Sequence, residues 1–132
     1  MTIRRKSLGF TLLELMIVMT IMLILLSIAG GRYQQSVLRS KEAVLKQDLF
    51  VMRQAIEQFT LDKQAAPQSL EELASAGYLR GVPKDPITNQ TDWRPVYDDT
   101  LLSPEQVITG IVDVKSSSEL VSPFEGTPYS SW

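Results

Sequence analysis

The sequence predicts an α+β fold in which one long N-terminal helix is packed by a small antiparallel sheet. Three observations predict it. An apolar run from Phe10 to Gly31 precedes an amphipathic stretch that ends near Asp62, and only two later stretches have strand character. We therefore expect a short basic leader (1–9), a membrane-spanning helix (10–31) and a globular domain (32–132) that includes the amphipathic half of the helix.

The composition limits the classes of function. The 132 residues include 13 Lys plus Arg and 15 Asp plus Glu, and removal of the basic leader would change the formal net charge from −2 to −5. An acidic remainder without a basic stripe argues against a nucleic-acid partner. The chain has no Cys to form a disulfide and no His to act as a general base, to complete a Ser/His/Asp triad or to bind zinc. We therefore predict that the protein is not an enzyme.

The apolar run contains one charged side chain, Glu14. The run is about as long as the ~20 residues with which a helix crosses a bilayer. The basic leader before it, with Arg4, Arg5 and Lys6, places the N-terminus on the cytoplasmic side. A carboxylate at membrane depth costs several kcal/mol, so it indicates a function and requires a partner. If the bond after Gly9 were cut, the new amine of Phe10 would lie one helical turn from Glu14.

The residues from Arg4 to Leu15, RRKSLGFTLLEL, resemble the class III signal of type IV pilins and of type II secretion pseudopilins. The resemblance implies that a prepilin peptidase cuts between Gly9 and Phe10 and then N-methylates Phe10. It also implies that Glu14 pairs with the Phe10 amine of a neighbouring subunit and sets the axial register of a homopolymer. The alternatives are an uncleaved single-pass anchor and a pairing of Glu14 with the amine of its own chain.

Gly30 and Gly31 follow the apolar run, and each costs about 1 kcal/mol relative to Ala inside a helix. We expect a hinge at this pair, and close packing of helices at small residues is the alternative. Beyond it, apolar residues recur at separations of three, four or seven and predict one buried stripe: Leu38, Leu45, Leu49, Met52, Ile56 and Phe59. Charged residues, Glu42 and Arg53 among them, are expected on the other faces.

The next signals lie close together. Ser69 followed by Glu72 resembles a capping box and predicts a short helix that runs to Ala76 and ends at Gly77. Tyr78 and Leu79 should return to the core. The prolines of Pro83-Lys84-Asp85-Pro86 predict an extended, turning connection. A short helix followed by this turn is similar to the major pseudopilin of type II secretion.

Two stretches rich in β-branched and aromatic residues predict the strands, Trp93–Tyr97 and Gln106–Val114. We interpret Asp98 and Asp99 as a solvated turn between them. The family resemblance implies a calcium-binding loop near the C-terminus, and its candidate ligands are Asp113, Ser117, Glu119 and Glu125. Calcium binds six to eight oxygens. The alternative is a loop held by the packing of Phe124, Tyr129 and Trp132.

The resemblance implies a structural subunit of the type II secretion pseudopilus. Such a subunit leaves the inner membrane of a Gram-negative-type envelope and joins a periplasmic filament that drives protein export across the outer membrane. Its partners would be other copies, the prepilin peptidase, the inner-membrane assembly platform and minor pseudopilins. A type IV pilus pilin is the close alternative, and the absence of Cys and the Pro83–Pro86 turn favour the pseudopilin. A membrane-anchored periplasmic binding domain is the third hypothesis.

Overall fold

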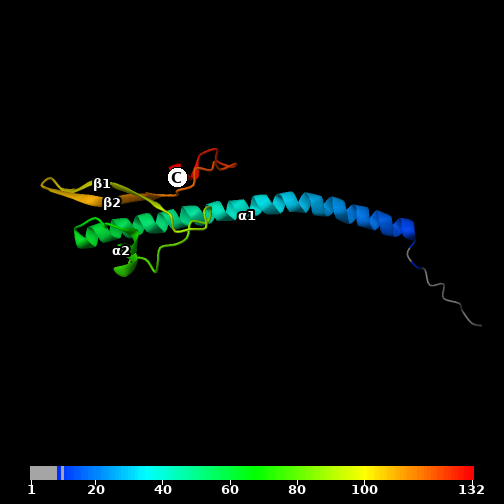
Figure 1. Cartoon of the computed structure of the whole chain (residues 1–132), viewed down its shortest axis with the longest axis horizontal. Helices are drawn as coiled ribbons and strands as arrows, with labels where there is room; N and C mark the ends of the chain where they lie inside the picture. Colours follow the sequence, from blue (N-terminus) through cyan, green and yellow to red (C-terminus); the bar gives the residue numbers. More distant parts are fainter. Residues whose placement is uncertain (1–8, 10) are drawn as a thin grey trace, which may run out of the picture. The chain divides into compact units, whose positions relative to one another are not determined.

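The computed structural model describes Gly9 and residues 11–132 (Figure 1). Its elements are helix α1 (Leu12–Lys63), helix α2 (Leu70–Ser75), strand β1 (Arg94–Ser103), strand β2 (Gln106–Lys115) and the 3-10 helix η1 (Tyr129–Ser131). The chain divides into two compact units, the first ending at Arg39 and the second comprising Ser40–Trp132. Helix α1 contributes to both units. The predicted α+β class, with a long N-terminal helix and a small antiparallel sheet, is confirmed.

Helix α1 begins where the hydroxyl of Thr11 accepts a hydrogen bond from the amide of Glu14 at 3.1 Å. A hydroxyl in this position satisfies one of the amides that a helix leaves unpaired at its start. The helix then continues through Gly30 and Gly31 without a break. Two glycines cost only about 1 kcal/mol each, which is too little to end a helix among strong helix formers. A hinge at this pair therefore stays a prediction.

The core of the second unit is built on one face of α1. Five residues of the predicted stripe are buried there: Leu45, Leu49, Met52, Ile56 and Phe59. The sixth, Leu38, belongs to the first unit and is only half-buried. Other elements complete the cluster with Leu73, Leu79, Trp93, Ile111, Val114 and Tyr129. Figure 1 shows α2 and the β1–β2 hairpin on opposite sides of this part of α1, so the helix is covered from two directions.

The short helix α2 is found where it was predicted. Its N-cap is Ser69, whose hydroxyl accepts a hydrogen bond from the amide of Glu72 at 3.2 Å. The carboxylate of Glu72 reaches back to the amide of Gln68 at 2.7 Å, one residue earlier than in the usual capping box. After the helix, Gly77 has a φ of 87°, a left-handed conformation that glycine adopts readily and that commonly ends helices.

The hairpin is longer than predicted. Strands β1 and β2 pair antiparallel from Arg94 opposite Lys115 to Ser103 opposite Gln106. Asp98 and Asp99 lie within β1, so their interpretation as a turn is wrong. Both side chains remain exposed, and the carboxylate of Asp99 accepts a hydrogen bond from Thr109 on β2. Pairing with β2 therefore outweighs the low strand propensity of aspartate.

Candidate assembly site

The predicted processing site is described in part. Gly9 is exposed, and Phe10 lies outside the described residues. The predicted cleavage and methylation at Phe10 are therefore chemical expectations from the sequence. The part of the site that the structure describes begins at Thr11 and Glu14.

Glu14 lies in the first turn of α1. Its amide is bound to the hydroxyl of Thr11, and the amide of Leu15 donates to the Thr11 carbonyl at 3.1 Å. A negative charge in a first turn interacts favourably with the helix dipole, by about 0.3–1 kcal/mol. Among the described residues, the Glu14 carboxylate has no hydrogen-bond or ion-pair partner. The dipole is thus the only compensation that the described part of the chain supplies.

The helix around Glu14 is apolar and exposed. Its large side chains from Leu12 to Ile28 are between 44% and 79% exposed. By length and composition α1 could cross a membrane, since an 18-residue window has a mean hydropathy of 2.6 and none of it is buried. The hydroxyls of Thr20 and Ser27 donate to carbonyls four residues earlier, at 2.8 and 2.9 Å. These hydroxyls are satisfied within their own helix, whereas the described residues give the Glu14 carboxylate no partner.

The Pro83–Pro86 connection is organised by Asp85, which is fully buried. Its carboxylate accepts hydrogen bonds from the amide of Ile87 at 2.8 Å and from the hydroxyl of Ser116. Burial, with a smaller contribution from the charge of Asp85, raises the pKa of the Asp48 carboxyl on α1. The hydrogen bond from Ser116 to Asp85 ties the Pro83–Pro86 connection to the segment that follows β2.

The four predicted calcium ligands do not form one group. Each binds a different partner: Asp113 binds Arg53, Glu119 binds Arg94, Glu125 binds Lys46 and Ser117 binds Asp92. The hydrogen bond from Arg94 lowers the pKa of Glu119. Over Gly9 and residues 11–132, no group of three or more acidic, His or Cys side chains could hold a metal. Since calcium needs six to eight oxygens, these four residues do not fit a calcium ion.

Two α1 residues that were expected on outer faces, Glu42 and Arg53, contact residues near the C-terminus instead. Glu42 is only 6% exposed, and its carboxylate accepts hydrogen bonds from Ser122 at 2.6 Å and Tyr129 at 2.7 Å. Its expected exposure is wrong because these two hydroxyls replace water around the charge. The signal was available, since Glu42 precedes Leu45 by three residues and thus continues the spacing of the buried stripe.

Tyr129 is part of the same contact. Burial, together with the hydrogen bond to the Glu42 carboxylate, raises the pKa of its hydroxyl to about 12. Its ring packs edge to face against the ring of Trp132, with centroids 4.9 Å apart. Of the three aromatic residues expected to hold the loop, Tyr129 is buried, Trp132 packs against the core and Phe124 is 37% exposed. The packing of Tyr129 and Trp132, which was given as the alternative to a calcium loop, is therefore observed.

A family model described as the prokaryotic N-terminal methylation motif matches residues 4–30. No curated protein and no solved structure matched the chain. The matched residues contain the basic part of the leader (4–9), the predicted cleavage position and Glu14. The motif implies, in general, processing by a prepilin peptidase and polymerisation into filaments. The motif, together with a long N-terminal helix and a small antiparallel sheet, supports a type IV pilin-like protein that forms either a pilus or a pseudopilus.

Proposed function

We propose that this chain is a structural subunit of the type II secretion pseudopilus. A prepilin peptidase removes residues 1–9 and methylates Phe10. Copies then leave the inner membrane and join a periplasmic homopolymer, with the help of the assembly platform and minor pseudopilins. Growth of the filament drives protein export across the outer membrane. The observation that carries the proposal is the lone carboxylate of Glu14 on an exposed apolar helix, within the methylation motif.

The Glu14 carboxylate explains why assembly would have one register. An uncompensated carboxylate in lipid costs several kcal/mol, and the Phe10 amine of a neighbouring copy can compensate it. Because the acid and the amine lie on different copies, the contact repeats head to tail and need not close. Contacts of this type produce filaments rather than rings. On assembly, the apolar side chains from Leu12 to Ile28 leave the lipid and pack against the helices of other copies.

The second unit also offers apolar surface to other copies. On α1, four large apolar side chains are exposed: Val44, Phe50, Val51 and Leu61. Gln47, Gln54 and Gln58 lie between them at helical spacing and are also exposed. The outward stripe of a helix in a soluble domain is normally charged or strongly polar. An outward stripe of apolar and uncharged residues favours contact with further subunits.

Two features favour a pseudopilus over a pilus. The chain has no Cys, whereas many pilins close their C-terminal loop with a disulfide. The sequence of the Pro83–Pro86 turn also resembles the major pseudopilin. The methylation motif is common to both, so a type IV pilin remains the alternative. Deletion of the gene should retain exported proteins in the periplasm, whereas loss of surface fibres with normal export would support the pilin.

The register hypothesis is tested by assembly in the host. Glu14→Ala and Glu14→Gln should both be cleaved and inserted in the membrane but should fail to form filaments, because neither side chain carries a charge for the amine. Glu71→Gln, which removes an exposed carboxylate from α2, is the matched control and should assemble normally. Normal filaments from both Glu14 variants would refute the register role.

The processing step has its own test. Mass spectrometry of the protein purified from its host should show a chain that begins at methylated Phe10. Gly9→Val should accumulate with its leader attached, since the peptidase of this family needs a minimal side chain beside the cut bond. An intact leader on the wild-type protein would contradict the proposed polymer and would favour a simple tethered domain.

A further inference from the structure

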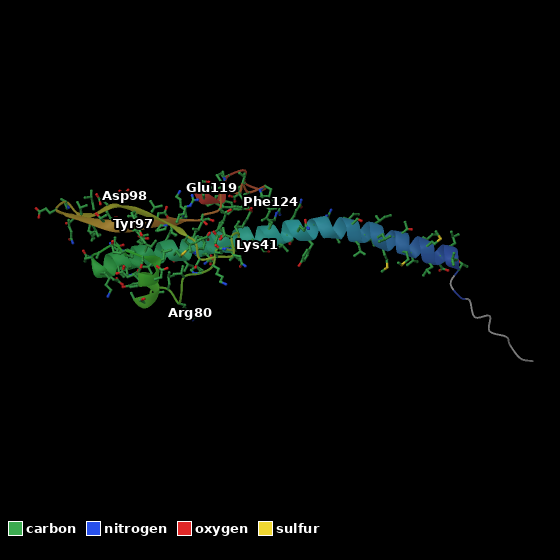
Figure 2. The ribbon with its side chains drawn as sticks, in the orientation of Figure 1. Lys41, Arg80, Tyr97, Asp98, Glu119 and Phe124 are labelled. Carbon is green, nitrogen blue, oxygen red and sulfur yellow. The ribbon has the colours of Figure 1, made fainter. Side chains whose placement is uncertain are left out.

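The residues after β2 have little regular structure of their own. We call residues 116–132 the C-terminal segment. It contains η1 and one isolated bridge between Val121 and Pro128. Main-chain hydrogen bonds within the segment satisfy part of its polar groups, for example from the amide of Tyr129 to the carbonyl of Leu120 at 3.0 Å. Its carboxylates need partners from other elements. Figure 2 shows Glu119 and Phe124 of this segment on one side of α1, and Arg80 on the other.

Arg53 of α1 joins the end of β2 to the last residue of the C-terminal segment. Its Nε donates to Oδ1 of Asp113 at 2.6 Å, and its Nη2 donates to the main-chain oxygens of Val114 at 3.1 Å and Trp132 at 2.7 Å. One carboxylate and two main-chain oxygens are the ligand types that calcium prefers. Here they surround a guanidinium, whose planar fork can bind several oxygens at once.

Two further cations bind the two acids of the segment. Nζ of Lys46 contacts the carboxylate of Glu125 and lies 4.9 Å from the ring centroid of Trp132. Arg94, at the start of β1, donates from Nη1 to Glu119 at 2.7 Å. Every carboxylate side chain from Asp113 to Trp132 therefore has a cation of the same chain beside it.

Glu42 supplies the opposite charge at a second point of attachment. Its carboxylate accepts the hydroxyl hydrogens of Ser122 and Tyr129, and all three residues are buried. The Ser122 hydroxyl in turn accepts hydrogen bonds from the amides of Phe124 at 3.3 Å and Glu125 at 3.2 Å. Helix α1 thus holds the C-terminal segment through both Glu42 and Arg53.

We propose that Arg53, Lys46 and Arg94 are the built-in counterions of the C-terminal segment, so that it folds without a divalent cation. They replace the calcium ion that the family resemblance implies. Arg53 is the central one because it binds three oxygens, whereas Lys46 and Arg94 form exposed pairs of the kind that contributes little alone. The inference concerns the second unit and is independent of the proposed filament.

Tryptic cleavage after Lys115 tests the proposal on the full-length chain in detergent micelles. This cut releases the C-terminal segment, which mass spectrometry identifies. The wild-type chain should be cut equally fast in EGTA, in millimolar calcium and in millimolar magnesium. Arg53→Gln should be cut about tenfold faster or more in all three, because a charge-assisted contact to three oxygens is lost.

Arg80→Gln is the matched control, since Arg80 is exposed and lies on the other side of α1 (Figure 2). It should be cut at the wild-type rate. Arg53→Lys should be cut at an intermediate rate, because an ammonium keeps the charge but not the fork. A specific slowing of wild-type cleavage by calcium would overturn the proposal. This measurement uses the wild-type chain alone, so it does not depend on whether a variant folds. Equal rates for Arg53→Gln and Arg80→Gln would overturn it as well.

Discussion

Tyr129→Phe should lower the free energy of unfolding of the second unit by about 1.5–3 kcal/mol, although it removes a single oxygen atom. The lost hydroxyl donates to Oε1 of Glu42 at 2.7 Å, and hydrogen bonds to charged groups contribute this amount. Water cannot replace the hydroxyl, because Tyr129 is 2% exposed and Glu42 is 6% exposed. Since Ser122 still donates to the same oxygen at 2.6 Å, we expect the lower half of the range.

Urea unfolding of the full-length chain in detergent measures the effect. The chain has two tryptophans, Trp93 and Trp132, and both belong to the second unit, so their fluorescence reports on that unit alone. Tyr97→Phe is the matched control. The Tyr97 hydroxyl donates to the carbonyl of Gln68 at 3.2 Å, and Tyr97 itself is 55% exposed. Water can replace this bond, and the cost should be below about 0.5 kcal/mol.

A double-mutant cycle separates the pairwise contribution. Ser122→Ala removes the second donor to Glu42, and its effect should not add to that of Tyr129→Phe, with a coupling free energy above about 0.5 kcal/mol. Equal destabilisation by Tyr129→Phe and Tyr97→Phe, or additive effects of the two core variants, would show that Glu42 is not a shared acceptor.

Three other expectations use the same unfolding assay. Gly110→Ala should cost about 1–3 kcal/mol, because its Cβ would lie 2.5 Å from Cβ of Ala66, whereas Gly81→Ala meets nothing within 4 Å and should be near neutral. Asp85→Ala should cost at least about 1–3 kcal/mol, since a part-buried amide and a buried hydroxyl lose their acceptor. The pKa of Tyr129 is raised from 10.0 to about 12, so the folded state keeps a proton that the unfolded state loses. Stability should fall as the pH rises through this interval, and the fall should be shallower in Tyr129→Phe.

The sequence predicts those features that depend on neighbours along the chain. The spacing of Leu45, Leu49 and Met52 identifies the buried face of α1, because residues three and four apart lie on one side of a helix. Ser69 marks the start of α2, because its hydroxyl reaches an amide only three residues away. These rules need no knowledge of the rest of the fold.

The features that were missed depend on residues far apart in sequence. Arg53 and Asp113 are separated by 60 positions, and Glu42 and Tyr129 by 87. Nothing in the local pattern of charges distinguishes an arginine that binds three oxygens from one in solvent. Asp98 was missed for a related reason, because its strand conformation is imposed by the partner strand rather than by its own propensity.

Of the three acids Glu14, Glu42 and Asp85, Glu14 is the one whose carboxylate has no donor among the described residues. Glu42 and Asp85 are removed from water, and in each case hydroxyl or amide donors of the same chain surround the carboxylate. Glu14 lies among apolar side chains that would face lipid, and the described residues give its carboxylate no donor. An unpaired carboxylate at membrane depth costs several kcal/mol. We propose that the new Phe10 amine of a neighbouring copy is the missing donor, and that the resulting contact is the one on which a filament is built.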